Sequence, residues 1–365
     1  MIQVKEAIGI ILEEIKPLKA EETDVLSALD RVLAEDVFAA RPNPPWDNSA
    51  MDGYALISSD IKGAGPDSPA ILNVIYDLPA GSEPKGAVKK GTAVRIMTGA
   101  PMPEGADAVV MVENTAKGPD DTVLIRAMAR PGENIRKSGE DFKAGELVVK
   151  AGSLIRPAEV AMLATIGRPR VNVRRRPRVA IISTGTELVD IDEVPPKGKI
   201  TNSNGYMLCA LVAEAGAEPV HLGIAVDTKE ALLEKLRAAL SSDCIITSGG
   251  VSVGDYDFVK DVLKEMGSHM IFWKVALKPG KPLAFGVIGG KPAFGLPGNP
   301  ISSLVSFEQF VRPALLKMAG VKDIFRRVLP ARLTTDVKLK PGRMNFIRAA
   351  LRIKDGGFTV SPLEG

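Results

Sequence analysis

The stretch RVAIISTGTEL, residues 178–188, decides the fold of the second half of the chain. Its apolar run is followed at once by a Thr-Gly-Thr turn, and a short uninterrupted apolar run is typical of a strand buried on both faces. Similar strand patterns follow at 218–226, 244–248, 270–277, 282–288 and 292–296. Helical patterns alternate with them at 202–216, 227–241, 251–267 and 300–320. This alternation predicts a mostly parallel sheet with helices on both faces, a three-layer α/β domain over residues 173–322.

Three glycine-containing loops, STGTEL, TSGGVSVGDYD and GLPGNP, each follow one of these strands. Ligands of open α/β sheets bind beyond the carboxyl ends of the strands, so we expect the loops to meet there. One such loop would be explained by a tight turn, whereas three at one edge predict a binding site. Their exposed backbone N–H groups suit an anion, although P-loop spacing is absent. The residues predicted to hold the ligand are Thr184, Gly185, Asp227, Ser248, Gly249, Gly250, Ser252, Pro297, Gly298 and Asn299.

The segment WKVALKPGKP, residues 273–282, brings three lysines toward the same edge: Lys274, Lys278 and Lys281. Three lysines alone usually indicate a solvated surface. Here they follow an apolar strand, and Pro279 and Gly280 force a turn between the last two. We therefore expect them to bind phosphate or another oxyanion.

Four acids lie at predicted strand ends or in the adjoining loops: Glu187, Asp227, Asp255 and Asp257. Carboxylate oxygens are suitable ligands for a hard divalent cation, so the pattern predicts Mg²⁺ beside a phosphorylated ligand. Glu187, Asp255 and Asp257 are the expected metal ligands. Asp227 fits a helix N-cap equally well, and that alternative stays open.

The first half of the chain lacks this regular alternation of strands and helices. Short strand patterns at 92–99, 106–114, 121–128 and 146–152 alternate with glycine and proline turns. They predict an inserted β-rich domain over residues 43–139. An N-terminal amphipathic helix and a second helix, opening at Pro157 and stopped by Gly167, flank it. We expect these helices to form one layer of a linking domain made of residues 1–42 and 140–172.

The stretch WDNSAMDGYA, residues 46–55, places four short polar residues within six positions: Asp47, Asn48, Ser49 and Asp52. Such a density either builds an Asx-rich turn or presents ligands. The turn explains Asn48 and Ser49 but leaves Asp52 without a role.

Composition bounds the remaining function classes. The chain has 365 residues and a formal net charge of only +3, which gives no support for a nucleic-acid or membrane-surface partner. Charges interrupt the N-terminal apolar pattern, and no apolar run is long enough to span a bilayer. Cys209 and Cys244 match neither a zinc site nor a disulfide framework. A cytoplasmic protein is expected. His221 and His269 lie outside polar contexts, so we expect positioned charges and metal ions rather than a nucleophilic triad.

Seven strings occur in this order: PPWDNSAMDGYA, RIMTGAPMPEGADAVV, GENIRKSGEDFKAGE, VAIISTGTEL, TSGGVSVGDYDFVK, KPGKPLAFG and GLPGNPISSLVSFEQFVRP. Together they resemble the molybdopterin molybdenumtransferase family, which includes bacterial MoeA and the E domain of gephyrin. The resemblance extends from the N-terminal helix to about residue 361. It implies insertion of molybdate into adenylylated molybdopterin, with AMP release and magnesium assistance. It also implies elongated homodimers whose subunits have four domains.

The resemblance carries over residue by residue. The family's functional residues correspond to Asp52, Thr98, Asp141, Glu187, Asp227, Asp257, Lys274, Lys278 and Lys281. The lysines are expected to hold molybdate or the substrate phosphates, and Glu187 and Asp257 to manage magnesium or cofactor orientation. Asp52 and Thr98 are expected to close the site from the partner subunit, although Thr98 also fits a plain turn residue.

The expected fold class is therefore multidomain α/β plus β, with residues 323–365 starting an incomplete C-terminal β domain. Family members continue beyond the string matching SPLEG, so this domain is expected to be truncated or unusually short. Contact with the molybdopterin adenylyltransferase is also expected. Three alternatives stay open: a non-catalytic molybdopterin-binding scaffold of the same fold, a tungstate-inserting paralogue, and a hydrolase of ordinary nucleotides.

Overall fold

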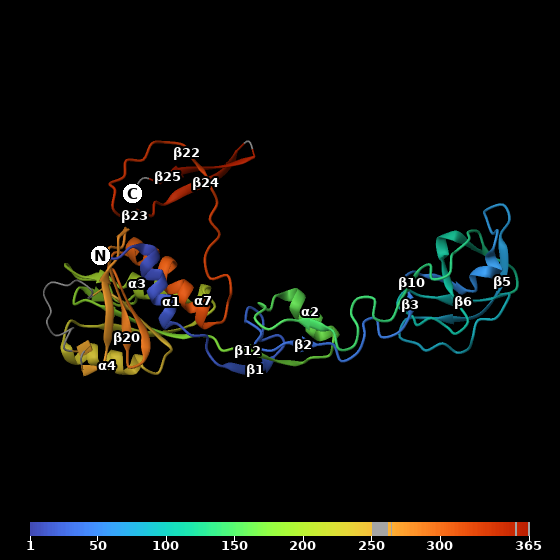
Figure 1. Ribbon diagram of the computed structural model, residues 1–365, viewed down its shortest axis with the longest axis horizontal. Coiled ribbons are helices and arrows are strands. Elements are labelled where there is room, and N and C mark those ends of the chain that lie inside the picture. The colour runs from blue at the N-terminus through green and yellow to red at the C-terminus, as the bar shows by residue number, and fades with distance from the viewer. Residues whose placement is uncertain (250–261, 264, 355, 364–365) are drawn as a thin grey trace. The chain divides into compact units, whose positions relative to one another are not determined.

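A computed structural model describes residues 1–249, 262–263, 265–354 and 356–363 of the chain (Figure 1). It divides into two compact units. The first, here the α/β unit, comprises Met1–Glu35, Ala151–Ala161 and Arg168–Gly365, and the second, the β unit, comprises Asp36–Lys150 and Met162–Gly167. Four predicted site residues lie outside the described residues: Gly250, Ser252, Asp255 and Asp257. The four-domain boundaries stay a prediction.

A six-stranded sheet forms the centre of the α/β unit. Its strands, in spatial order, are β16 (Glu218–Ala225), β13 (Arg178–Thr184), β17 (Cys244–Ser248), β21 (Lys291–Leu296), β20 (Pro282–Ile288) and β18 (His269–Lys274). The first four are mutually parallel, whereas β20 runs antiparallel to both of its neighbours. The predicted mostly parallel sheet is confirmed. The reversal at β20 arises because Gly289 and Gly290, both at positive φ, make a hairpin turn that joins only antiparallel strands.

Helices cover both faces of this sheet, as predicted. Val179 and Ile181 of β13 pack with α3 (Ser203–Glu214), α6 (Pro300–Ser306) and α7 (Arg312–Met318), the last two joined by a π-helical turn, Phe307–Val311. Ala180 and Ile182 point to the opposite face, toward α4 (Lys229–Ala239). Alternate residues of a strand face opposite sides, so one apolar run serves two helical layers.

The N-terminal helix also belongs to this core. Val4, Ala7 and Ile11 of α1 (Val4–Glu14) are buried in the same cluster as Val179 and α7. The second helix, α2 (Pro157–Thr165), begins at Pro157 as predicted but contributes no residue to that cluster. The expectation that the two helices form one layer stays a prediction. The apolar face of α1 is buried by packing on the large sheet, a contact that helix periodicity alone does not specify.

Several smaller sheets accompany the large one in the α/β unit. An antiparallel pair, β1 (Ala20–Asp24) and β12 (Arg170–Arg174), precedes the large sheet. Toward the C-terminus, β22 (Arg332–Leu333), β25 (Gly357–Pro362) and β24 (Ala349–Lys354) form a small sheet, and β23 (Met344–Asn345) pairs in parallel with β19 (Leu277–Lys278).

The β unit contains its own six-stranded sheet. In spatial order its strands are β7 (Ala108–Met111), β4 (Gly53–Leu56), β6 (Thr92–Ile96), β5 (Ala70–Leu78), β9 (Thr122–Ile125) and β8 (Thr115–Lys117). Two apolar clusters are buried in this unit, one around Leu56 and Ile125 and the other around Leu78 and Ile96. Short 3₁₀ turns lie at Ser58–Ile61 and Val112–Asn114. Two short pairs, β3 (Asn48–Ser49) with β10 (Ile135–Arg136) and β2 (Val37–Phe38) with β11 (Leu147–Val149), accompany the sheet.

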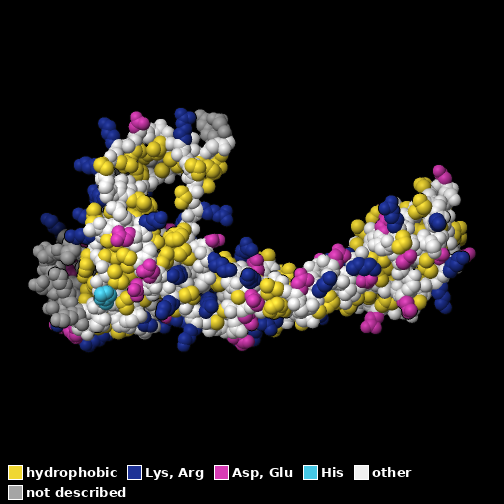
Figure 2. Space-filling view, viewed as in Figure 1, with side chains coloured by type: hydrophobic (Ala, Val, Ile, Leu, Met, Phe, Trp, Pro, Cys, Tyr) yellow, Lys and Arg dark blue, Asp and Glu magenta, His cyan; other side chains and the backbone are white. Residues whose placement is uncertain are grey.

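Charges of both signs are interspersed over the visible face of each unit, as the small net charge predicts (Figure 2). Within the described part of the chain, no helix is both long and apolar enough to cross a membrane.

Candidate functional site

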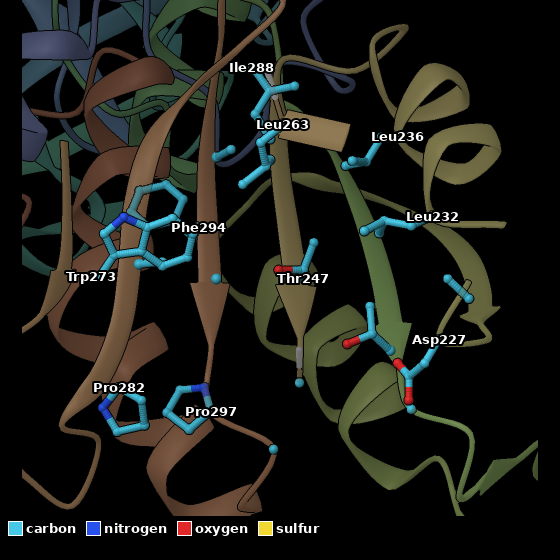
Figure 3. Close-up of a pocket in the computed structure, with 18 of the residues that line it drawn as sticks. Asp227, Leu232, Leu236, Thr247, Leu263, Trp273, Pro282, Ile288, Phe294 and Pro297 are labelled. Carbon is cyan, nitrogen blue, oxygen red and sulfur yellow. The ribbon is translucent and has the colours of Figure 1, made fainter. Parts of the chain in front are cut away.

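A cavity of about 400 Å³ lies in the α/β unit along the face of the large sheet that α4 covers, and one end of it reaches the carboxyl ends of β13, β17 and β21, where the sequence predicts a site. Thr184, Gly185, Glu187, Asp227, Gly249, Pro297 and Gly298 are among its lining residues. Figure 3 shows Asp227, Pro282 and Pro297 at one end and Ile288 and Leu263 at the other. The loops after three strands therefore do converge. The cavity combines a polar end with an apolar wall, a combination common to small-molecule sites.

Two glycines permit the close approach of these loops. Gly185 has φ +150°, and a Cβ there would lie 2.5 Å from Oε2 of Glu187. Gly249 has φ +90°, and its Cβ would lie 2.5 Å from the carbonyl oxygen of Thr184. Both distances are too short for a real Cβ, so side chains at these positions would displace the cavity wall. These two glycines shape the site itself rather than only permitting turns.

The polar end is held together by Asn204, a residue that the sequence analysis did not single out. Its Nδ2 donates to Ser248 Oγ at 2.9 Å and to the carbonyl of Gly298 at 2.8 Å. One buried amide thus ties the end of β17 to the loop after β21. The signal in the sequence is the string Asn-Ser-Asn at a helix start, but one of its asparagines is an ordinary cap. Asn202 accepts from Gly205 N–H as the N-cap of α3.

Asp227 is not the N-cap of α4. That role belongs to Thr228, whose hydroxyl accepts from Ala231 N–H at 3.3 Å. The carboxylate of Asp227 instead accepts from Thr186 N–H at 3.1 Å, which connects the loop after β16 to the loop after β13. The open alternative between cap and site residue is therefore settled against the cap.

Two predicted ligand-binding side chains are engaged within the protein. Ser248 is directed to Asn204, and Asn299 caps α6 by accepting from Ile301 and Ser302 N–H groups. Neither residue lines the cavity, although Gly249 and Gly298 beside them do. Asn299 shows the usual preference of a short polar side chain at a helix start for the local backbone, whereas Ser248 at the end of β17 is bonded by an asparagine 44 positions away.

The three lysines do not line the cavity. Lys274 ends β18, Lys278 lies in β19 and Lys281 precedes β20, and all three are exposed. Their neighbours Trp273 and Pro282 are the residues that contribute to the wall (Figure 3). Within the described residues, none of the three side chains forms a hydrogen bond or an ion pair given by the structure. Lys274 and Lys281 are thus next in sequence to residues of the cavity wall, and the expected binding role of the three lysines stays a prediction.

The predicted acids of the β unit serve its turns. Asp52 Oδ1 accepts from Thr98 N–H at 2.7 Å and from Thr98 Oγ1 at 2.8 Å. The backbone N–H of Thr98, followed by its hydroxyl, lowers the pKa of Asp52. Asp141 accepts from Arg136 at 2.9 Å and from Asn43 Nδ2 at 2.7 Å.

Of the other polar residues in the 46–55 stretch, Asn48 and Ser49 form β3, and Asp47 bonds to a distant segment. Asp47 pairs with Lys137 at 2.8 Å and accepts from Ser138 N–H, and these contacts lower its pKa. Ser49 Oγ donates to the carbonyl of Met51 at 2.6 Å. Asp52 therefore does have a structural role, while its second oxygen makes no hydrogen bond given for the described residues.

Metal ligands are sparse in the described structure. Glu187 and Asp227 are the two carboxylates that line the cavity, and no group of three or more His, Cys, Asp or Glu residues that could hold a metal ion occurs among the residues described.

Comparison with known proteins identifies the family. Residues 2–167 match the MoeA N-terminal region (domain I and II), and residues 180–317 match a probable molybdopterin binding domain. The chain belongs to the MoeA family. The cavity lies within the second matched segment, and Asp52, Thr98 and Asp141 lie within the first.

Relatives support the same assignment. The chain is 39% identical over 365 residues to a molybdopterin molybdenumtransferase of Nostoc sp. (strain PCC 7120), covering 98% of this chain and 84% of the relative. It is 39% identical to a molybdopterin molybdenumtransferase of Staphylococcus aureus (strain COL), covering 99% of this chain and 86% of the relative. A solved MoeA structure from Pyrococcus horikoshii OT3 matches with a TM-score of 0.84 and 32% identity, over 100% of this chain and 91% of the other. Membership of the MoeA family and its multidomain α/β plus β fold are thus confirmed.

Proposed function

We propose that this chain is a molybdopterin molybdenumtransferase that inserts molybdate into adenylylated molybdopterin and releases AMP. The observation that carries the proposal is the coincidence of a preformed cavity with the matched molybdopterin-binding segment. The 39% identity to transferases of that name over nearly the whole chain supports it. The protein acts in the cytoplasm in this proposal and receives its substrate from the molybdopterin adenylyltransferase.

The chemistry requires two anions to meet. Molybdate is a dianion and the pterin nucleotide carries phosphates, so their approach is repulsive by about 4 kcal/mol per pair of unit charges at 4 Å near a protein surface. Lys274, Lys278 and Lys281 are exposed cations without an ion-pair partner among the described residues, and the first and last of them adjoin Trp273 and Pro282 of the cavity wall. We assign them the capture of molybdate and of the substrate phosphates, outside the wall made by Trp273 and Pro282.

The cavity itself would hold and orient the organic part of the substrate. Its apolar wall, which includes Trp273 and Phe294, excludes water from a planar ring system, and its polar end offers backbone groups at Gly185, Gly249 and Gly298. Asn204 keeps two of these loops at a fixed separation. Holding the reactants in fixed positions lowers the entropic cost of their reaction.

The donor set fits magnesium. Mg²⁺ is usually bound through one or two carboxylates together with substrate phosphates, and Glu187 and Asp227 both line the cavity. Asp227 retains one oxygen beyond its bond to Thr186. These two residues, with Asp255 and Asp257, would hold the ion. When bound, it would neutralise phosphate charge during cleavage of the phosphoanhydride.

We further propose a homodimer in which Asp52, Thr98 and Asp141 act on the cavity of the partner subunit. The family resemblance motivates this, and the second oxygen of Asp52, which makes no hydrogen bond given for the described residues, is available for it. Mixing an Asp52→Ala chain with a Lys278→Ala chain should give more AMP release at low molybdate than either variant alone, because a mixed dimer has one intact composite site. No recovery after subunit exchange, verified by mass, excludes this arrangement.

The central test is molybdate-dependent AMP release from adenylylated molybdopterin. Lys278→Ala should impair AMP release at low molybdate without unfolding the chain, because the backbone of Lys278, which accepts from Phe346 N–H at 2.8 Å, is retained. Lys338→Ala, another exposed lysine of the same unit, is the matched control. Wild-type turnover in Lys278→Ala removes the lysine from the mechanism. Substrate binding without any AMP release supports the scaffold alternative, and equal turnover of plain ATP supports a general hydrolase. A parallel assay with tungstate decides between the two oxyanions.

A further inference from the structure

The segment between β14 (Leu188–Val189) and β15 (Ile200–Thr201) begins and ends beside Glu187. The two short strands pair in parallel. Ile200 N–H donates to the carbonyl of Glu187 at 2.8 Å, and Asn202 N–H donates to that of Val189 at 2.9 Å. We call residues 190–199 the excursion. Its base is thus fastened to the backbone of a residue that lines the cavity.

Both ends of the excursion are held by side chains. At its start, Tyr206 Oη on α3 donates to Asp190 Oδ1 at 2.7 Å, and Ile191 N–H donates to the same oxygen at 2.8 Å. At its end, Lys199 Nζ contacts the carbonyl of Thr186, the residue immediately before Glu187. The two contacts lie on either side of Glu187 along the chain.

The tyrosine is itself oriented by packing. Its ring lies 5.0 Å from the imidazole of His221 on β16, with the planes inclined at 56°. The hydrogen bond to Asp190 is the main cause that raises the pKa of Tyr206 to about 12, and the same bond lowers the pKa of Asp190. The donor thus remains protonated and the acceptor remains ionised throughout the neutral range.

We propose that Tyr206 and Asp190 form a clasp that positions Glu187 at the cavity, and that both are positioning residues for the transferase reaction. This inference rests on the proposed function, because the role of Glu187 in the reaction is part of that proposal. The carboxylate of Glu187 lies directly over Gly185, 2.5 Å from where a Cβ at that position would stand, and the loop that carries it begins at this glycine. A small displacement of the loop therefore moves the carboxylate relative to a substrate phosphate.

Four variants separate positioning from general stability. Tyr206→Phe removes the hydroxyl but keeps the ring against His221, and Asp190→Ala removes the acceptor. Asp190→Asn keeps an oxygen acceptor for Tyr206, so it should retain the exchange rates and kinetics of the wild type. Asp192→Ala is the matched control, because Asp192 lies on the same excursion and makes no side-chain hydrogen bond given for the described residues.

The first measurement is hydrogen exchange of the amides of residues 188–202 in the full chain. We expect the amides of Ile191 and Ile200 to exchange about tenfold faster in Tyr206→Phe and Asp190→Ala, and at the wild-type rate in Asp190→Asn and Asp192→Ala. Unchanged exchange in the first two variants overturns the clasp. This readout does not depend on activity.

The second measurement is the steady-state kinetics of AMP release. With the clasp open, we expect kcat to fall about tenfold while KM for the pterin nucleotide changes less, because the cavity wall remains in place. Asp190→Asn should recover kcat. Faster exchange with unaltered kcat would overturn the positioning role. Absence of AMP release in the wild type would instead refute the proposed function, and the exchange experiment would still test the clasp.

Discussion

Asn204 provides the sharpest test of how the cavity is built. Replacing it with alanine removes two hydrogen bonds, to Ser248 Oγ at 2.9 Å and to the carbonyl of Gly298 at 2.8 Å. Each is worth about 1 kcal/mol net, and the orphaned Ser248, only 3% exposed, adds to the loss. Asn204 Oδ1 has no partner among the described residues, so its removal offsets part of that. We expect the α/β unit to lose about 2 kcal/mol of unfolding free energy.

The chain offers a built-in reporter for this measurement. It has two tryptophans, Trp46 in the β unit and Trp273 in the α/β unit. In a Trp46→Phe background, Trp273 fluorescence during urea unfolding follows the α/β unit alone, and the linear dependence on urea gives the change in free energy. The matched control is Ser203→Ala, which alters the same helix turn at an exposed position.

The same substitution should also affect binding. Without Asn204, the loops after β17 and β21 are no longer joined by a side chain, so KM for the pterin nucleotide should rise more than kcat falls. If Asn204→Ala matches Ser203→Ala in both the unfolding midpoint and KM, then the bridge neither stabilises the unit nor shapes the site, and the reasoning is refuted.

Three further variants probe the rest of the chain. Asp243→Ala breaks the bidentate pair with Arg175, in which Asp243 is 13% exposed, and should lower stability by about 3 kcal/mol. Burial opposes ionisation of Asp243, but its hydrogen bonds outweigh burial and lower its pKa. Because the folded pKa of Asp243 is the lower one, the pair stabilises fully above about pH 4 and its contribution is lost as the pH falls further, so urea titrations should find a smaller loss of stability in acid for Asp243→Ala than for the wild type. Gly249→Ala forces a Cβ against Thr184 and should raise KM for the pterin nucleotide; unaltered kinetics would show that the loop relaxes freely. Asp52→Asn keeps an acceptor for its turn, so retained folding with at least about tenfold slower AMP release assigns a role to the charge, whereas full activity assigns Asp52 to the turn alone.

The sequence by itself determined the layers and the location of the site. Four adjacent apolar residues of β13 place Val179 and Ile181 on one face and Ala180 and Ile182 on the other, which requires helices on both faces. The glycine loops after β13, β17 and β21 meet because parallel strands end at one edge. The alternation of side chains along a strand and the alternation of strands with helices can both be followed along the chain, so they are predictable from sequence.

Only the tertiary structure decided which side chains face the cavity. Trp273 lines it whereas Lys274, one residue on, does not, because neighbours in a strand point apart and bulges shift their register. Asn204 reaches Gly298 across 94 positions of sequence, so no local pattern encodes that contact. The packing of α1 on the large sheet is decided in the same way. Residue types and their periodicity determine which face of a segment is apolar and which of its groups can hydrogen-bond. The residues that contact this face or these groups lie on distant segments, which only the folded chain brings together.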